Sequence, residues 1–133
     1  MSSGILIDTS AYAQFRRGQA SIVELIAGAE RVFLGAISLG ELEAGFMLGR
    51  RIEENRAALR DFLDEPFVSI VPVDQAVANL YGKFFAELRR AGTPVPVNDI
   101  WIAASALHVR ARLVTFDTDF SRFRELDAVV LKN

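Results

Sequence analysis

The chain has 133 residues, of which 51% are hydrophobic, and its formal net charge is −2. This length suits a single domain with a real core, and the slightly negative charge does not indicate a protein that coats nucleic acid nonspecifically. The absence of Cys excludes disulfides, thiolate zinc sites and cysteine nucleophiles, and no apolar run approaches the roughly 18 residues of a membrane helix. The N-terminus lacks the basic region of a signal peptide. We therefore expect one domain over residues 1–133, located in the cytoplasm and without a membrane segment.

Short apolar runs alternate with amphipathic segments along the whole chain. The runs predict strands over 4–8, 31–36, 68–73, 112–117 and 128–132. The segments between them predict helices over 9–18, 21–30, 38–49, 50–65, 73–92, 98–111 and 118–126. Two prolines in the segment 93–97 predict a loop. Because no hairpin signal joins neighbouring strands, the order predicts an α/β fold with a parallel sheet and helices on both faces.

Four carboxylates stand at or soon after the ends of predicted strands or open a predicted helix. They are Asp8, Glu41, Asp99 and Asp117. Open α/β sheets bind ligands at the carboxyl ends of their strands, so these distant residues are expected to converge in one crevice. A cluster of acids repels itself unless a positive charge lies between its members, and a divalent cation is the natural candidate.

Helix capping is the alternative explanation for each acid. Asp8, Asp99 and Asp117 each stand where a predicted helix begins, and Asp is a favourable residue there. Ser38 and Glu41 have the spacing of a capping box. Asp74 also follows a strand and opens a helix, and we interpret it as a cap only. For any one acid taken alone, capping is the stronger explanation; the argument for a site rests on their convergence.

Further polar residues surround these acids in the sequence. Asp119 follows Asp117 by two positions, Thr9 and Ser10 follow Asp8, and Thr115 lies two positions before Asp117. Hydroxyl groups beside carboxylates can orient metal ligands, although ordinary turn chemistry explains them too.

Histidine and arginine residues offer weaker candidates. His108 is the only histidine, and acid–base cleavage of RNA with histidine usually needs a pair of groups, so we expect it at the surface or at the edge of the core. Arg89 and Arg90 could contact phosphate, but a helix C-terminus also favours cations.

Four segments resemble, in their order along the chain, the successive motifs of PIN domains. They are ILIDTSAY, ISLGELEAG, VNDIWIAASAL and LVTFDTDF. The most similar group is the VapC ribonucleases of toxin–antitoxin systems, and the resemblance covers nearly the whole chain from Ile5. It implies a single PIN-like domain with a five-stranded parallel sheet in the order 3-2-1-4-5, flanked by helices. The family's acidic positions correspond to Asp8, Glu41, Asp99 and Asp117.

The resemblance also implies roles for the neighbouring residues. Asp119 falls on a further, more variable acidic position. Ser10 and Thr115 match polar positions of the site, and Asn98 precedes the third acid. We expect Asp8, Asp99 and Asp117 to bind a metal directly or through water, and Glu41 to bind it or to orient the attacking water.

The implied activity is that of an endoribonuclease dependent on Mg²⁺ or Mn²⁺, which cleaves RNA with a metal-activated water to give 5′-phosphate and 3′-OH ends. The implied partners are an RNA substrate and a cognate small antitoxin. The resemblance also implies a homodimer, which can form part of a larger toxin–antitoxin assembly. Two alternatives stay open from the sequence. One is a PIN-like domain that binds RNA or a partner without cleaving. The other is a receiver-like signalling domain, which needs an acid pair after its first strand, where this chain supplies only Asp8.

Overall fold

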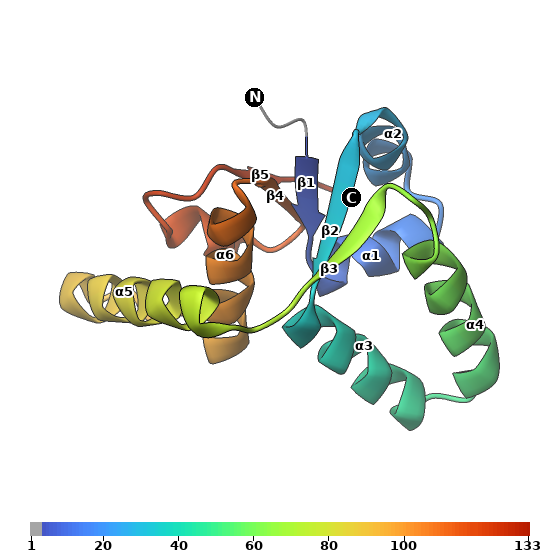
Figure 1. Cartoon of the computed structure of the whole chain (residues 1–133), viewed down its shortest axis with the longest axis horizontal. Helices are drawn as coiled ribbons and strands as arrows, with labels where there is room; N and C mark the ends of the chain where they lie inside the picture. The colour runs from blue at the N-terminus through green and yellow to red at the C-terminus, as the bar shows by residue number, and fades with distance from the viewer. Residues whose placement is uncertain (1–3) are drawn as a thin grey trace.

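The computed structural model describes residues 4–133, whose strands form one parallel sheet (Figure 1). The strands are β1 (Gly4–Ile7), β2 (Arg31–Gly35), β3 (Val68–Val71), β4 (Arg112–Thr115) and β5 (Ala128–Val130). They lie in the order β3-β2-β1-β4-β5, and every neighbouring pair is parallel. The predicted α/β class, the parallel sheet and the strand order are confirmed.

Helices occupy the connections between the strands. They are α1 (Thr9–Arg16), α2 (Ala20–Gly28), α3 (Ala36–Leu48), α4 (Ile52–Leu63), α5 (Gln75–Ala91), α6 (Val97–Val109) and the 3-10 helix η1 (Thr118–Arg122). The helix expected over 118–126 is therefore much shorter than predicted. Phe120 and Phe123 are both buried in the core, and a 3-10 turn aligns side chains three positions apart. In residues 4–133, no helix is long and apolar enough to cross a membrane.

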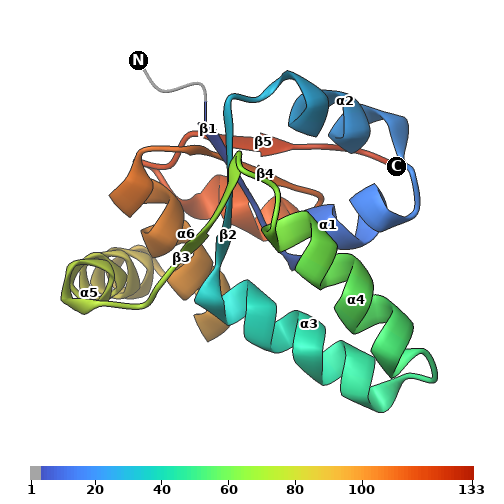
Figure 2. The same ribbon diagram turned by 45° about the vertical axis from the view of Figure 1, so that its right-hand side comes forward.

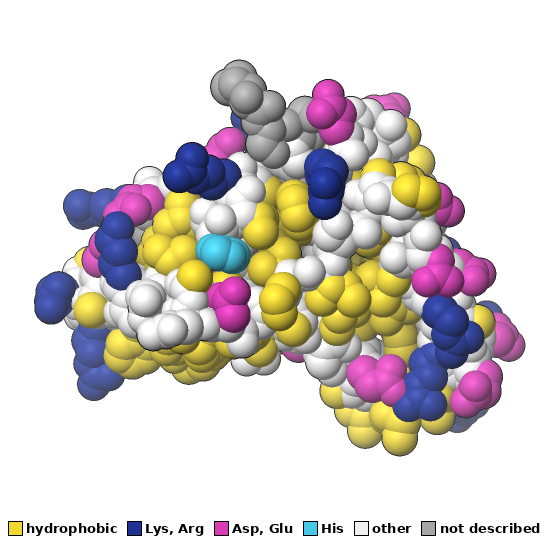
Figure 3. Space-filling model, viewed as in Figure 1, with side chains coloured by type: hydrophobic (Ala, Val, Ile, Leu, Met, Phe, Trp, Pro, Cys, Tyr) yellow, Lys and Arg dark blue, Asp and Glu magenta, His cyan; other side chains and the backbone are white. Residues whose placement is uncertain are grey.

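The sheet has a separate hydrophobic core on each face. Side chains of β1 alternate between them: Leu6 belongs to one core, and Ile5 and Ile7 belong to the other. Helices α5 and α6 cover the Leu6 face, while α1, α2 and α4 cover the opposite face, and the two groups lie on opposite sides of the sheet in Figures 1 and 2. On the outer face seen in Figure 3, acidic and basic side chains are interspersed, and several Lys or Arg side chains lie at the end of the molecule where α5 ends.

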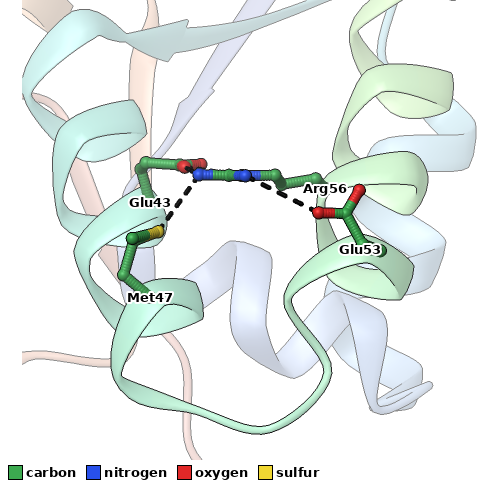
Figure 4. A network of polar contacts seen from close by, with 4 residues as sticks. All are labelled: Glu43, Met47, Glu53 and Arg56. Carbon is green, nitrogen blue, oxygen red and sulfur yellow. Dashed lines mark hydrogen bonds and ion pairs between the residues drawn. The ribbon is translucent and has the colours of Figure 1, made fainter.

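Helices α3 and α4 form an antiparallel pair that extends beyond the sheet (Figure 2). The guanidinium group of Arg56 on α4 reaches across to Glu43 and lies 3.1 Å from the sulfur of Met47 (Figure 4). Glu53 lies 3.8 Å from the same guanidinium group. These contacts are partly exposed and add little to stability, because surface ion pairs contribute about 0–1 kcal/mol each.

The start of α3 differs from the prediction. Strand β2 passes directly into the helix, with Gly35 in the capping position and Ala36 as the first helical residue. Ser38 therefore lies inside the first turn, and the predicted capping box of Ser38 and Glu41 is wrong. Capping does not explain Glu41, which lies in the second turn of α3. By contrast, the prediction that Asp74 caps α5 is confirmed, since its carboxylate accepts the Val77 N–H at 3.0 Å.

Candidate active site

Two of the acids follow neighbouring strands at the centre of the sheet. Asp8 comes directly after β1, and Asp117 comes two residues after the end of β4. Because β1 and β4 pair in parallel, with Ile7 opposite Val114, their carboxyl ends lie at the same edge. Helix α3, which follows β2, carries Glu41, and the first turn of α6 carries Asp99. The predicted convergence thus follows from the topology of the sheet.

Asp8 is held by three hydrogen bonds in a buried position. Its side chain caps α1 by accepting the Ala11 N–H at 2.8 Å, and the same oxygen accepts the Ser10 hydroxyl at 2.8 Å. The other oxygen accepts the Thr115 hydroxyl at 2.5 Å. Asp8 is 4% exposed, and burial raises the pKa of its carboxyl group, against the opposing effect of these hydrogen bonds. Capping and a place in the site are therefore compatible for this residue.

The two hydroxyl groups also connect Asp8 to the strand-end segment after β4. The Ser10 oxygen accepts the Phe116 N–H at 3.1 Å, and the Thr115 oxygen accepts the Asp117 N–H at 3.0 Å. A hydroxyl group can donate one hydrogen bond while accepting another, which suits this bridging role. The two side chains therefore fix the backbone of the segment that carries Asp117.

Three carboxylates form the tightest acidic group of the described chain. Asp99, Asp117 and Asp119 each offer an oxygen, and these oxygens lie within 4.8 Å of one another. Asp117 accepts the Asp119 N–H at 2.9 Å, which holds the turn at the start of η1. Oδ2 of Asp99 is buried and accepts no hydrogen bond from any of residues 4–133.

Asp99 has the most perturbed acidity of the group. Burial is the largest cause, and the charges of Asp117, Asp119, Glu41 and Asp8 add to it, so that the pKa of Asp99 rises to about 6. The other four acids are therefore close enough to act on Asp99 electrostatically. Perturbed acids in this kind of position often mark functional sites.

Glu41 lies beside this group with both carboxylate oxygens engaged. One oxygen accepts the Thr9 hydroxyl at 2.5 Å, and the other accepts the side-chain amide of Asn98 at 3.2 Å. Thr9 begins α1 and Asn98 lies in the first turn of α6, so contacts from two helices orient the carboxylate of a third.

Comparison with known proteins agrees with this arrangement. The PIN-domain family matches residues 5–126, which is nearly all of the described chain. The chain belongs to the PIN-domain family. The strand order also separates it from receiver-like domains, which have the order 2-1-3-4-5, so that alternative is excluded.

Several relatives of this PIN domain are named as VapC ribonucleases. Ribonuclease VapC4 of Mycobacterium tuberculosis is 30% identical over 98 residues, covering 74% of this chain and 75% of the relative. Ribonuclease VapC1 of Haemophilus influenzae is 31% identical over 98 residues, covering 73% and 72%. The resemblance to VapC proteins seen in the sequence is confirmed.

Solved structures give the same result for the fold of this PIN domain. VapBC2 from Rickettsia felis, bound to a DNA fragment from its promoter, matches with a TM-score of 0.84 at 25% identity, over 97% of this chain and 99% of the other. DNA-bound VapBC from Salmonella typhimurium matches with a TM-score of 0.85 at 26% identity, over 98% of both chains.

The acidic group of this PIN domain fits a divalent cation. Carboxylate oxygens are the ligands that Mg²⁺ and Mn²⁺ prefer, and three of them face one small space. The buried oxygen of Asp99 lacks a protein donor, and a cation would supply the missing interaction. Asp119 belongs to the tight group although the sequence suggested only an auxiliary position, whereas Asp8 and Glu41 lie outside it with hydrogen-bonded oxygens.

One neighbour of the acids in this PIN domain escaped the sequence argument. Arg122, at the end of η1, lies 4.0 Å from the Asp119 carboxylate. In the sequence, only the three-residue separation of Asp119 and Arg122 points to this contact, and oppositely charged residues with that spacing are common. His108 is exposed, in agreement with the expectation for it.

Proposed function

We propose that this chain is a metal-dependent endoribonuclease and the toxin of a type II toxin–antitoxin pair. The observation that carries the proposal is the group of Asp99, Asp117 and Asp119, with oxygens within 4.8 Å and one buried oxygen that lacks a protein donor. Relatives named as VapC ribonucleases support the RNA substrate and the reaction class.

The residues of the site have distinct roles in this proposal. Asp99, Asp117 and Asp119 would hold Mg²⁺ or Mn²⁺, and Asp8 and Glu41 would contribute to the same site directly or through water. A bound cation would supply a Lewis acid for the scissile phosphate and for a water molecule, and hydrolysis by that water would leave 5′-phosphate and 3′-OH ends. Glu41 accepts hydrogen bonds from two helices, and this fixed carboxylate is suited to orient the attacking water.

The supporting side chains keep the acids in place without reacting. Thr115 and Ser10 bind the Asp8 carboxylate and the backbone after β4, and Thr9 and Asn98 bind Glu41. Such contacts reduce the freedom of the ligands and so favour a single arrangement around a cation. No protein nucleophile is needed.

RNA cleavage by the purified chain tests this proposal. Activity should vanish with excess EDTA and return with Mg²⁺ or Mn²⁺, and the products should be substrates for ligation through 5′-phosphate and 3′-OH ends. Undiminished cleavage in EDTA by preparations free of other nucleases would refute it. A chain that binds RNA without cleaving it under any metal condition would favour the non-catalytic alternative.

A small antitoxin as partner belongs to the same proposal. The related structures are named as VapBC complexes. Apolar side chains at the end of α3 are open to a partner, since Met47 is 57% and Leu48 is 91% exposed. An arginine of the partner would find strong hydrogen-bond acceptors in the acidic group. Expression of this chain alone should arrest growth, and co-expression of the neighbouring reading frame should relieve the arrest.

We also propose a homodimer, within a larger toxin–antitoxin assembly, in the cytoplasm. Strand β3 is an edge of the sheet, and Ile70 on this edge is 48% exposed, with Val73 beyond it at 41%. An exposed apolar edge is usually covered in the working protein. The lack of Cys suits a reducing compartment.

A further inference from the structure

A cleft of about 770 Å³ opens between the end of α5 and the residues that follow η1. Its lining includes Phe84, Leu88 and Phe123, which are almost fully buried and form an apolar floor. Three arginines also line it: Arg90, Arg122 and Arg124. The volume falls within the range of roughly 300–1,000 Å³ that ligand pockets have.

The charge of this cleft is positive. Within residues 4–133, the side chains of Arg90 and Arg124 form no ion pair and no hydrogen bond. The lining residue Glu125 is already paired with Lys83 at 2.7 Å. Besides Glu125, the lining holds one other carboxylate, that of Glu87, against three guanidinium groups. Figure 3 shows Lys and Arg side chains gathered at this end of the molecule.

Arg122 connects the cleft to the acidic group. Its guanidinium group donates a hydrogen bond to the Pro94 carbonyl at 2.8 Å and lies 4.0 Å from Asp119. These contacts hold the side chain at the border between the two. Arg122 therefore belongs both to the lining of the cleft and to the surroundings of Asp119.

A polyanionic substrate needs such a region in this chain. The net charge is −2, and five acids gather at the proposed site, so the site itself repels the phosphates of an RNA strand unless cations or basic side chains lie near it. RNA affinity depends mainly on phosphate contacts with Arg and Lys. Arginine forks bind phosphate oxygens well, and an apolar floor suits the face of a base or ribose.

We infer that this cleft binds the nucleotide next to the scissile bond, with Arg90, Arg122 and Arg124 on its phosphates and the base or ribose against the apolar floor. The inference rests on the proposed ribonuclease function and adds the path of the RNA strand over the surface. Arg122 is a positioning residue in this account, because it holds the flanking phosphate and not the reacting one.

The first experiment measures RNA affinity in the Asp99→Asn background, where cleavage is expected to be strongly reduced. A short fluorescein-labelled single-stranded RNA is titrated with protein between about 50 and 200 mM KCl. The double variant Arg90→Gln/Arg124→Gln should bind about tenfold more weakly, and its salt dependence should fall by roughly 0.7 per lost phosphate contact. Neither arginine side chain forms a hydrogen bond or ion pair within residues 4–133, so this variant should fold normally. Arg50→Gln/Arg60→Gln removes the same charge from exposed positions around α4 and should bind as the parent does.

The second experiment separates binding from catalysis in the otherwise wild-type chain. Arg122→Gln should raise KM about tenfold with little change in kcat, and Arg122→Lys should recover part of the loss because it keeps the charge. A thermal unfolding midpoint close to wild type excludes a folding defect, and the Arg90/Arg124 double variant supplies the same KM readout if Arg122→Gln misfolds.

Several results would overturn the inference. If Arg50→Gln/Arg60→Gln loses as much RNA affinity as Arg90→Gln/Arg124→Gln, the effect comes from net charge and not from the cleft. Normal RNA binding with lost antitoxin binding would assign the cleft to the protein partner. If the wild-type chain cleaves RNA with Mg²⁺ while the cleft variants match it, this inference fails and the ribonuclease function stands. A wild-type chain that neither binds nor cleaves RNA would remove both.

Discussion

The hydroxyl group of Thr115 donates a 2.5 Å hydrogen bond to the carboxylate of Asp8, although the two residues are 107 positions apart. The same hydroxyl oxygen accepts the Asp117 N–H. One side chain thus joins the ends of the two central strands and supports two acids at once.

Replacing Thr115 tests the importance of this link. Thr115→Val keeps the shape but leaves a buried carboxylate oxygen and a backbone N–H without a partner, so it should cost about 1–3 kcal/mol of unfolding free energy. Cleavage should also weaken, because both Asp8 and Asp117 lose support. Thr115→Ser keeps the hydroxyl group and is the matched control. Urea denaturation of both variants checks this, and equal stability of the Val variant and wild type would contradict it.

Exchanging Asp99 for Asn separates the site from capping. Asp99→Asn keeps the shape of the side chain but removes a ligand charge, so activity should fall at least about a hundredfold. Asp74→Asn is the control, because Asp74 is a cap and Asn caps as well as Asp. Rates with labelled RNA at saturating Mg²⁺ give the comparison. Similar activities of the two variants would show that Asp99 is no more than a helix-terminal residue.

Glu41 should matter for catalysis and not for the fold. Glu41→Gln retains an acceptor for either Thr9 or Asn98 but loses the charge, so kcat should fall about tenfold or more while the unfolding midpoint stays close to wild type. Asn98→Ala removes only the more exposed, 3.2 Å contact and should have a smaller effect on kcat. A Gln variant with wild-type kcat would remove Glu41 from the mechanism.

Stability of the metal-free protein should depend on pH through Asp99. The folded pKa of about 6 is higher than the ordinary value of 3.8, so the folded state binds this proton more tightly than the unfolded state. The resulting stabilisation is complete below about pH 4 and is lost as pH rises through about 6. For a partly exposed group, the effect should be on the order of 1 kcal/mol.

The difference in unfolding free energy between wild type and Asp99→Asn isolates this effect from that of other groups. Measured in EDTA between pH 4 and 7, the variant should gain stability relative to wild type as pH rises. Saturating Mg²⁺ should reverse the trend, because the cation binds the ionised carboxylate. A difference that is constant over this pH range would show that Asp99 is not perturbed.

Most of the fold and the neighbourhood of the acids follow from sequence pattern. Alternating apolar runs and helices require a parallel sheet, and the carboxyl ends of β1 and β4 then bring Asp8 and Asp117 together. The strand order itself was implied only by the resemblance of the motifs to PIN domains. The other features depend on periodicity and topology, which a single sequence displays.

The details that sequence could not provide depend on local backbone geometry. The place of Asp119 in the tight group depends on how the turn after Asp117 closes, through a hydrogen bond from the Asp119 N–H. The capping box failed because β2 enters α3 without a loop, which moves Ser38 into the helix. Arg122 is held at the cleft in part by a hydrogen bond to the carbonyl of Pro94, 28 positions earlier, which no local sequence pattern displays.

Equilibrium binding of Mn²⁺ tests most directly the claim that these acids form a cation site. Titration calorimetry at pH 7 should show saturable Mn²⁺ binding to the wild-type chain, and RNA cleavage should rise over the same concentrations. Binding should be lost in the triple variant Asp99→Asn/Asp117→Asn/Asp119→Asn with its fold intact. Equal Mn²⁺ affinity of the triple variant and wild type would contradict the account.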